Sequence, residues 1–180
     1  MYRARVPITI RHAKPSDAAA LVAHLKALAA EPGINIPLAP DELTLTVEQE
    51  RDALEDLEDS PRATMFVALD DKSIVGELSV KGISPRRAVA HVATLGMSVV
   101  ASHRRRGVGE LLMREAIAWA DAHGFLRLEL YVYARNAPAI ALYEKLGFTR
   151  EGRRAAFIRD GDAFLDDLVM ARLSGAARAG

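Results

Sequence analysis

The sequence contains no cysteine and no apolar run of membrane-spanning length. The first absence excludes disulfides, thiolate metal sites and a cysteine nucleophile. The second, with an N-terminus that lacks an apolar signal core, makes a soluble cytoplasmic protein without a membrane partner the default expectation. Net charge is absent too, because 24 Lys and Arg balance 24 Asp and Glu, so nucleic acid is not an expected partner. The five histidines include no close pair with ligand spacing, so we expect no metal.

The 180-residue chain is 50% hydrophobic and long enough for one domain with a substantial core. Neither a repeat nor a linker divides it, so we expect a single domain over 1–174 and a frayed tail over 175–180. Periodicity and turn residues predict strands over 8–11, 64–69, 74–81, 89–100, 126–133, 148–158 and 163–173. They predict helices over 15–30, 46–59, 108–123 and 136–146. This order is typical of an α/β (α+β) fold, a mixed sheet with helices on both faces and one parallel pair.

One stretch organises the chain: an apolar strand end leads into Arg104-Arg105-Arg106-Gly107-Val108-Gly109, and an apolar-periodic helix follows. A helix start leaves N–H groups without partners and attracts anions. Glycines let the backbone approach a ligand, and arginines supply charge with a geometry suited to phosphate. The loop therefore predicts a pyrophosphate site. The helix after it is expected to bury one face, made of Val108, Leu111, Leu112, Ala116, Trp119 and Ala120.

A second motif opens the next helix, where Asn136 is a good N-cap and Pro138 lies in the first turn. Its spaced residues are Asn136, Ala139, Tyr143, Gly147 and Phe148. Together the two motifs, in this order, resemble those of the GCN5-related N-acetyltransferase (GNAT) family. The resemblance covers most of the chain and is strongest over 89–148.

The resemblance implies a GNAT-like domain, a mostly antiparallel sheet of about seven strands, and acetyl-CoA as co-substrate where the parallel pair splays apart. Its pantetheine would pair with the backbone of Met97, Ser98 and Val99. The basic loop would hold its pyrophosphate through Arg104, Arg105, Arg106, Gly107, Val108, Gly109 and Glu110. Asn136 and Ala139 would lie near the pantetheine, and Tyr143 near the thioester sulfur.

The chemistry expected is direct attack of a primary amine in a ternary complex. A tetrahedral oxyanion would be stabilised by backbone N–H donors. The leaving thiolate, whose conjugate acid has a pKa of about 8.5 as a free thiol, would take a proton from Tyr143 as general acid. The general base stays open: His91, Glu77 and Glu129 are candidates, and an amine that is already deprotonated would need none.

Other interpretations fit the sequence less well. Gly107-Val108-Gly109 between a strand and a helix is also typical of a Rossmann loop, but Leu112 stands where a third small residue is needed. A P-loop is excluded, because the chain contains no Gly-Lys-Ser/Thr sequence. A non-catalytic acyl-CoA-binding or regulatory domain with the same fold remains the alternative to an acetyltransferase.

The acceptor amine, a small molecule or a peptide, is not identified by the sequence. Acidic residues crowd 41–59 and favour a cationic acceptor, whereas Arg153, Arg154 and Arg159 on the last hairpin could hold a carboxylate. Homodimers are common in the family that the motifs resemble, and the sequence leaves that assembly open.

Overall fold

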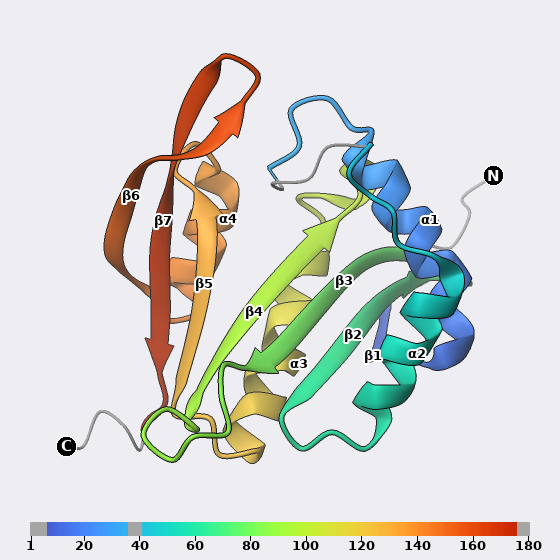
Figure 1. The fold of residues 1–180 in the computed structure, drawn as a ribbon, viewed down its shortest axis with the longest axis horizontal. Coiled ribbons are helices and arrows are strands. Elements are labelled where there is room, and N and C mark those ends of the chain that lie inside the picture. Colours follow the sequence, from blue (N-terminus) through green and yellow to red (C-terminus); the bar gives the residue numbers. More distant parts are fainter. Residues whose placement is uncertain (1–6, 36–40, 176–180) are drawn as a thin grey trace.

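The computed structural model describes residues 7–35 and 41–175, and its seven strands form one sheet in the order β1-β2-β3-β4-β5-β7-β6 (Figure 1). Neighbouring strands are antiparallel except for β4 and β5, which run parallel. The strands are β1 Thr9–His12, β2 Ala63–Asp70, β3 Ser73–Gly82, β4 Val92–Val99, β5 Arg127–Tyr133, β6 Thr149–Asp160 and β7 Ala163–Leu173. The helices are α1 Ala18–Ala29, α2 Val47–Glu58, α3 Val108–Ala122 and α4 Ala137–Lys145. The predicted mixed sheet is thus confirmed.

Helices cover both faces of the sheet, as expected. Figure 1 shows α1 and α2 in front of β1–β3, while α3 and α4 lie behind. The front helices bury a small cluster of Ala18, Leu21, Leu54 and Val67. The larger core lies under α3 and α4, and it includes Leu78, Leu112, Met113, Leu130 and Phe148. No helix in residues 7–35 and 41–175 is long and apolar enough to cross a membrane.

The prediction of the buried face of α3 was wrong at one position. Leu111 is 43% exposed, whereas Met113 is fully buried. Each residue turns about 100° around a helix axis, so the stripe at Val108, Leu112, Ala116 and Ala120 drifts toward Met113 along the helix. Leu111 is left on the other side of that stripe. Local periodicity located the apolar face, but the packing against the sheet decided its centre.

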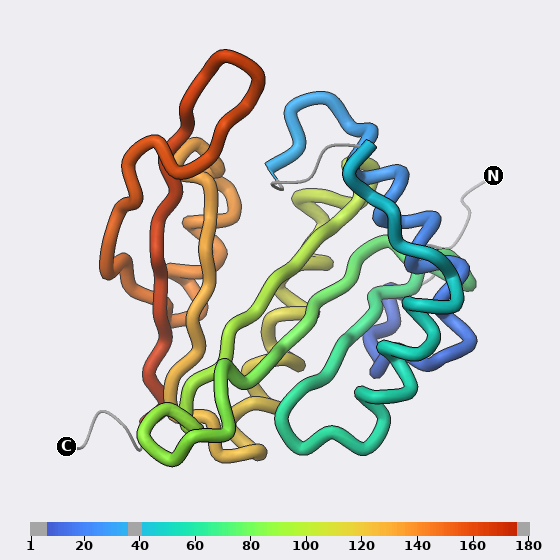
Figure 2. Tube along the Cα trace, viewed as in Figure 1, coloured from blue at the N-terminus to red at the C-terminus, as the bar shows by residue number. Residues whose placement is uncertain are grey.

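The parallel pair parts early, and this gap positions the site. β4 and β5 are in register only at Val92–Arg127, Ala93–Leu128 and Thr94–Glu129. β4 continues to Val99 and stays paired with β3, so its other edge faces the gap from residue 95 onward. Figure 2 shows the two traces diverging beyond this short ladder. The predicted splayed pair is confirmed.

Candidate functional site

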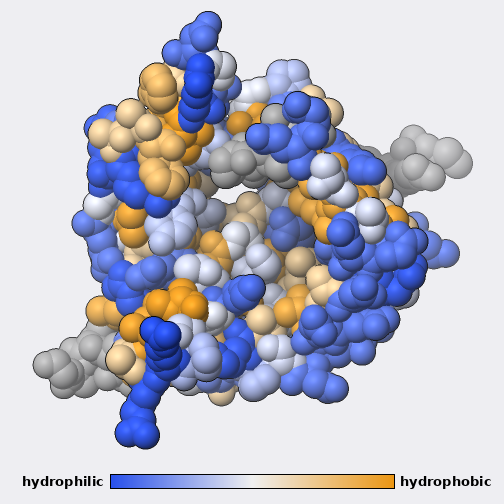
Figure 3. Space-filling model, viewed as in Figure 1, coloured by the Kyte–Doolittle hydropathy of each residue, from blue (hydrophilic) through white to orange (hydrophobic). Residues whose placement is uncertain are grey.

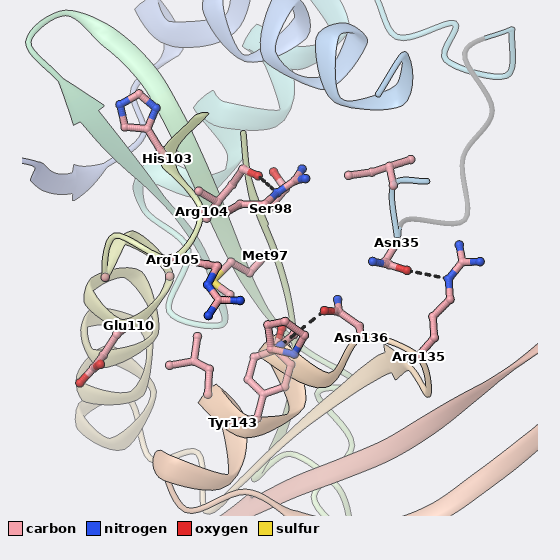
Figure 4. Close-up of a pocket in the computed structure, with 17 residues that line it drawn as sticks. Asn35, Met97, Ser98, His103, Arg104, Arg105, Glu110, Arg135, Asn136 and Tyr143 are labelled. Atoms are coloured by element: carbon pink, nitrogen blue, oxygen red, sulfur yellow. Dashed lines mark hydrogen bonds between the residues drawn. The ribbon is translucent and has the colours of Figure 1, made fainter. Parts of the chain in front are cut away.

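A cavity of about 800 Å³ lies where β4 and β5 part (Figure 4). Residues predicted for the cofactor line most of it: Met97, Ser98, Val99, Arg104, Arg105, Gly107, Gly109, Glu110, Asn136, Ala139 and Tyr143. Two other predicted residues lie outside the lining. Val108 is 1% exposed and belongs to the core under α3, whereas the side chain of Arg106 is exposed.

The basic loop has two residues in left-handed backbone conformation, Arg105 at φ +59° and Gly107 at φ +85°. Gly107 tolerates this conformation because it lacks a Cβ, and it is the N-cap of α3. The first intrahelical bond that closes here runs from the Leu111 N–H to the Gly107 carbonyl at 3.0 Å. The amides of residues 108–110 have no partner within α3 and form a donor site for an anion.

Gly109 is where α3 comes closest to β4 and α4. A Cβ added there would lie 3.2 Å from Met97 Cε and 3.3 Å from Leu142 Cδ2, tighter than ordinary van der Waals contact. Both neighbours line the cavity. The second glycine of the motif therefore serves close packing around the cavity rather than an unusual backbone angle.

The three consecutive arginines differ in what their side chains contact. Arg104 Nε donates to the Val99 carbonyl at 2.8 Å, and its guanidinium pairs with Glu31. Glu31 also accepts the Ala101 N–H at 3.1 Å, so this cluster holds the end of β4 to the segment after α1. Within residues 7–35 and 41–175, neither Arg105 nor Arg106 has a hydrogen-bond or ion-pair partner. Arg105 is therefore an unneutralised cation on the cavity wall.

The opposite wall comes from α4. Asn136 caps this helix, and its Oδ1 accepts the Ala139 N–H at 3.4 Å. Tyr143 is 7% exposed, and burial raises the pKa of its phenol to about 12. The phenol therefore stays protonated at neutral pH, and its hydroxyl has no hydrogen-bond partner in the part of the chain that the structure describes. Figure 4 shows Asn136 and Tyr143 on one side of the cavity and Met97 and Ser98 on the other.

The base candidates lie in three different environments. His91 is exposed, before β4 begins, at the far end of that strand from the cavity. Glu129 pairs with Arg127 at 2.6 Å on the closed part of β5. Glu77 alone connects to the lining: its Oε1 accepts the Ser98 hydroxyl proton at 2.9 Å. Burial raises the pKa of Glu77 to about 7.

Six further lining residues were not predicted: Ile34, Asn35, His103, Arg135, Pro138 and Leu142. Two of them, His103 and Arg135, adjoin the two motifs, and Pro138 and Leu142 lie within the second. Proximity to the motifs in the sequence could therefore have identified these four as lining residues. Asn35 comes from the segment after α1 and meets Arg135 Nε at 3.0 Å. That contact joins positions 100 residues apart, and no local pattern signals it.

A family model described as Acetyltransferase (GNAT) family matches residues 35–148, more than half of the chain. The chain belongs to this family. The predicted acyltransferase is confirmed by that membership.

Relatives along the whole chain agree. The L-amino acid N-acetyltransferase AaaT of Escherichia coli is 34% identical over 92% of this chain and 98% of its own. A crystal structure of a GNAT-family acetyltransferase from Streptococcus pneumoniae has a TM-score of 0.87, 33% identity, and coverage of 94% and 100% of the two chains. The crystal structure of a ribosomal-protein-alanine N-acetyltransferase from Brucella melitensis has a TM-score of 0.80 and 26% sequence identity. The match covers 92% of this chain and 99% of that chain.

Proposed function

We propose that this protein transfers the acetyl group of acetyl-CoA to a primary amine by direct attack within a ternary complex. The observation that carries the proposal is the convergence on one cavity of an unpaired strand edge, a free helix start and a buried phenol. These are the three groups that the pantetheine, the pyrophosphate and the departing sulfur of such a thioester would meet.

The chain's own groups fit this co-substrate. The open edge of β4 over residues 95–99 offers backbone groups to the amides of the pantetheine. The free amides at the start of α3 and the unpaired Arg105 fit a diphosphate, because both are donors that carry positive charge. When bound, acetyl-CoA supplies an activated acyl carbon with a thiolate leaving group.

In this proposal Tyr143 donates its phenolic proton to the sulfur as the acyl–sulfur bond breaks. Burial favours the protonated phenol, so the acid is present across the whole neutral pH range. A phenol with a raised pKa is also a weaker acid, so we expect the proton to move only as charge develops on sulfur. The chemistry needs no covalent enzyme intermediate, which agrees with a chain that has no cysteine.

The acceptor is proposed to be an α-amine. The names of the Escherichia coli and Brucella melitensis relatives specify the amino group of an L-amino acid and of a protein alanine, respectively. Alanine has only an α-amine, and every L-amino acid carries one too. Arg135 lines the cavity and Arg153 of β6 lines a neighbouring pocket, but each already pairs with a carboxylate, Asp160 and Asp166 respectively. An acceptor carboxylate would therefore replace one of these ion pairs.

The test replaces Tyr143 with Phe and measures the release of free CoA with a panel of amino acids and short peptides. We expect kcat to fall by about 100-fold or more, because the proton donor is lost. The dissociation constant of acetyl-CoA should stay within about threefold, since the ring and its packing remain. Tyr131→Phe is the matched control, because Tyr131 is 51% exposed on β5 and does not line the cavity.

Two outcomes would contradict this function. Unchanged turnover in Tyr143→Phe would remove Tyr143 as the acid. Tight binding of CoA by the wild-type protein with no release that depends on any acceptor would favour a non-catalytic acyl-CoA-binding or regulatory domain.

A further inference from the structure

A chain of three polar side chains crosses the front face of the sheet and ends at the cavity wall. Ser98 of β4 donates its hydroxyl proton to Glu77 of β3 at 2.9 Å, and its Oγ lies 3.0 Å from His24 Nε2 of α1. Glu77 and Ser98 are opposite each other in the β3–β4 ladder, so the register fixes this contact. His24 is 5% exposed, so the chain is anchored in the interior.

The direction of the hydrogen bonds follows from counting protons. Ser98 has one hydroxyl proton, and ionised Glu77 accepts it, so in this state His24 donates from Nε2 to the Ser98 oxygen. His24 Nδ1 is then unprotonated, and it is buried without a partner among the described residues. Burial lowers the pKa of His24, and the Ile74 backbone and the Glu31 carboxylate oppose this only in part, so the ring stays neutral at neutral pH. The Ser98 oxygen retains one lone pair for a further donor.

Glu77 faces few other charges. Glu50 of α2 is 7% exposed and also lacks a cationic partner in the part of the chain that the structure describes. Its repulsion adds to the burial that raises the pKa of Glu77, while the Ser98 hydrogen bond opposes both. His24 of α1 contacts Ser98 rather than Glu77, and the residue opposite Glu77 on β2 is the apolar Val67. Among the described residues Glu77 therefore has no counter-ion, so it takes up a proton readily.

The acceptor can approach from this face. Side chains alternate along a strand, so Ser98 and Gly96 share the front face of β4 while Met97 lies on the α3 side. Gly96 is exposed, and a Cβ there would have only Ser79 Oγ within reach, at 3.8 Å. Figure 3 shows this face hollowed between the α1–α2 side and the β6–β7 side of the molecule.

We propose that the Ser98 hydroxyl receives the proton of the acceptor ammonium and passes its own proton to Glu77, with His24 fixing the direction of the relay. This inference rests on the proposed function and identifies its missing base. The N–H bond of the ammonium breaks as an O–H bond forms on Ser98. The original Ser98 O–H bond breaks as an O–H bond forms on Glu77. The free amine keeps its lone pair for attack, and Glu77 ends neutral.

Ser98 is the residue that touches the acceptor, and Glu77 and His24 act through it. In the ionised state Glu77 is a proton acceptor only. Once protonated, it donates back to the Ser98 oxygen, and the Ser98 hydroxyl turns toward the acceptor side. Return to the starting state requires release of the proton from Glu77 to solvent through its partly exposed surface.

The test is the pH dependence of kcat/KM for the acceptor in wild type, Glu77→Gln, Glu50→Gln and Ser98→Ala. We expect the wild-type profile to rise through about pH 7 and to level off above it. Glu77→Gln should lose this rise and about 100-fold or more of the rate at neutral pH, because the proton acceptor is gone. Its acetyl-CoA dissociation constant should not change.

The neighbouring variants separate a relay from a structural role. Glu50→Gln removes the repulsion on Glu77 without touching the relay, so its profile should shift to lower pH and reach the wild-type plateau. Ser98→Ala keeps the backbone amides of β4 but should cut the plateau about as much as Glu77→Gln. A purely structural role would leave the pH profile of Glu50→Gln in place.

Failure of this inference is distinguishable from failure of the proposed function. If wild type acetylates an amine and Glu77→Gln keeps both its rate and its rise near pH 7, the relay is wrong and the acetyltransferase stands. If wild type acetylates no amine, the proposed function itself fails. Should Glu77→Gln not fold, an unshifted profile in Glu50→Gln or an undiminished plateau in Ser98→Ala would overturn the relay.

Discussion

Neighbouring residues of one type can serve different purposes, and the arginine triplet illustrates why. Arg104 donates to the Val99 carbonyl and pairs with Glu31, and these contacts hold the end of β4 in place. Arg105 adopts a left-handed conformation, which costs a non-glycine residue about 1 kcal/mol or more, and lines the cavity without a counter-ion. Arg106 is exposed and lies outside the lining. Charge that is exposed, unpaired and aimed at the cavity is the combination expected of a phosphate ligand.

Arg105→Ala should weaken CoA binding by about tenfold or more, because a charge-assisted hydrogen bond contributes about 1.5–3 kcal/mol. Arg106→Ala is the matched control, with the same change in net charge next door, and should cost less than about threefold. The measurement is titration calorimetry with CoA and with dephospho-CoA. If Arg105 binds the pyrophosphate, its loss is the same for both ligands. If the two substitutions had equal effects, the three arginines would contribute only a general positive potential, and Arg105 would make no specific contact with the pyrophosphate.

Glu77 also ties stability to pH. Its pKa in the folded protein, about 7, lies above the ordinary 4.5. Folding therefore favours the protonated form, so this contribution is complete below pH 4.5 and is lost as pH rises through 7. The free energy of unfolding should fall between pH 4.5 and 8 by up to about 3 kcal/mol. Urea unfolding of wild type and Glu77→Gln at several pH values measures this, and an equally steep decline in both would contradict it.

At the scale of elements, local chemistry located most helices and turns. Thr46 and Gln49 exchange the two hydrogen bonds of a capping box at the start of α2, where the sequence predicts a helix from residue 46. The Asp160–Asp162 turn joins β6 and β7 as expected. Each of these signals lies within a few residues, where the backbone satisfies its own polar groups. The two motifs could be recognised for the same reason, because each of them also lies within a short stretch of the sequence.

Features made by tertiary packing were not visible in the sequence. The face of α3 was misjudged at Leu111 because its centre depends on the sheet beneath it. The contact of Ser98 with His24 joins positions 74 residues apart and requires the β3–β4 register and the packing of α1 together. Glu77 was a candidate base among three, and only its environment sets it apart. Residues that act through long-range contacts therefore need the structure.

The close packing at Gly109 leads to a prediction about the distance of α3 from β4 and α4. Gly109→Ala should leave stability nearly unchanged, since the gain in helix propensity, about 1 kcal/mol, offsets crowding against Met97 and Leu142. Because both neighbours line the cavity and would yield into it, acetyl-CoA affinity should fall by about tenfold. Gly96→Ala is the control, as its Cβ enters open space on the front face of β4. Normal affinity in Gly109→Ala would show that Met97 and Leu142 can move elsewhere.

At the scale of the whole molecule, the sheet is nearly divided at the cavity. β1–β4 and β5–β7 are each continuous antiparallel arrays, yet only three residue pairs join β4 to β5. In most sheets such a gap would be closed by further ladder bonds or filled by side chains. Here the open edge of β4 faces a cavity of about 800 Å³ instead. The two halves diverge beyond the short ladder, which leaves the β4 edge open to a ligand that pairs with a strand.

A ligand in this gap should therefore stabilise the whole fold. At a free concentration of 100 times its dissociation constant, CoA should add about 2.7 kcal/mol to the free energy of unfolding, or about 5–10 °C in Tm for a domain of this size. Hydrogen exchange should slow at the amides of 95–99 that face the gap and at those of 108–110.

Adenosine 3′,5′-bisphosphate, which lacks the pyrophosphate and the pantetheine, is the control. This control ligand should leave the β4 amides unprotected even at concentrations that saturate its own binding, because it has no pantetheine to pair with the strand. Protection of β4 by both ligands alike would mean that the gap closes by itself, and the two halves would then not need the pantetheine to bridge them.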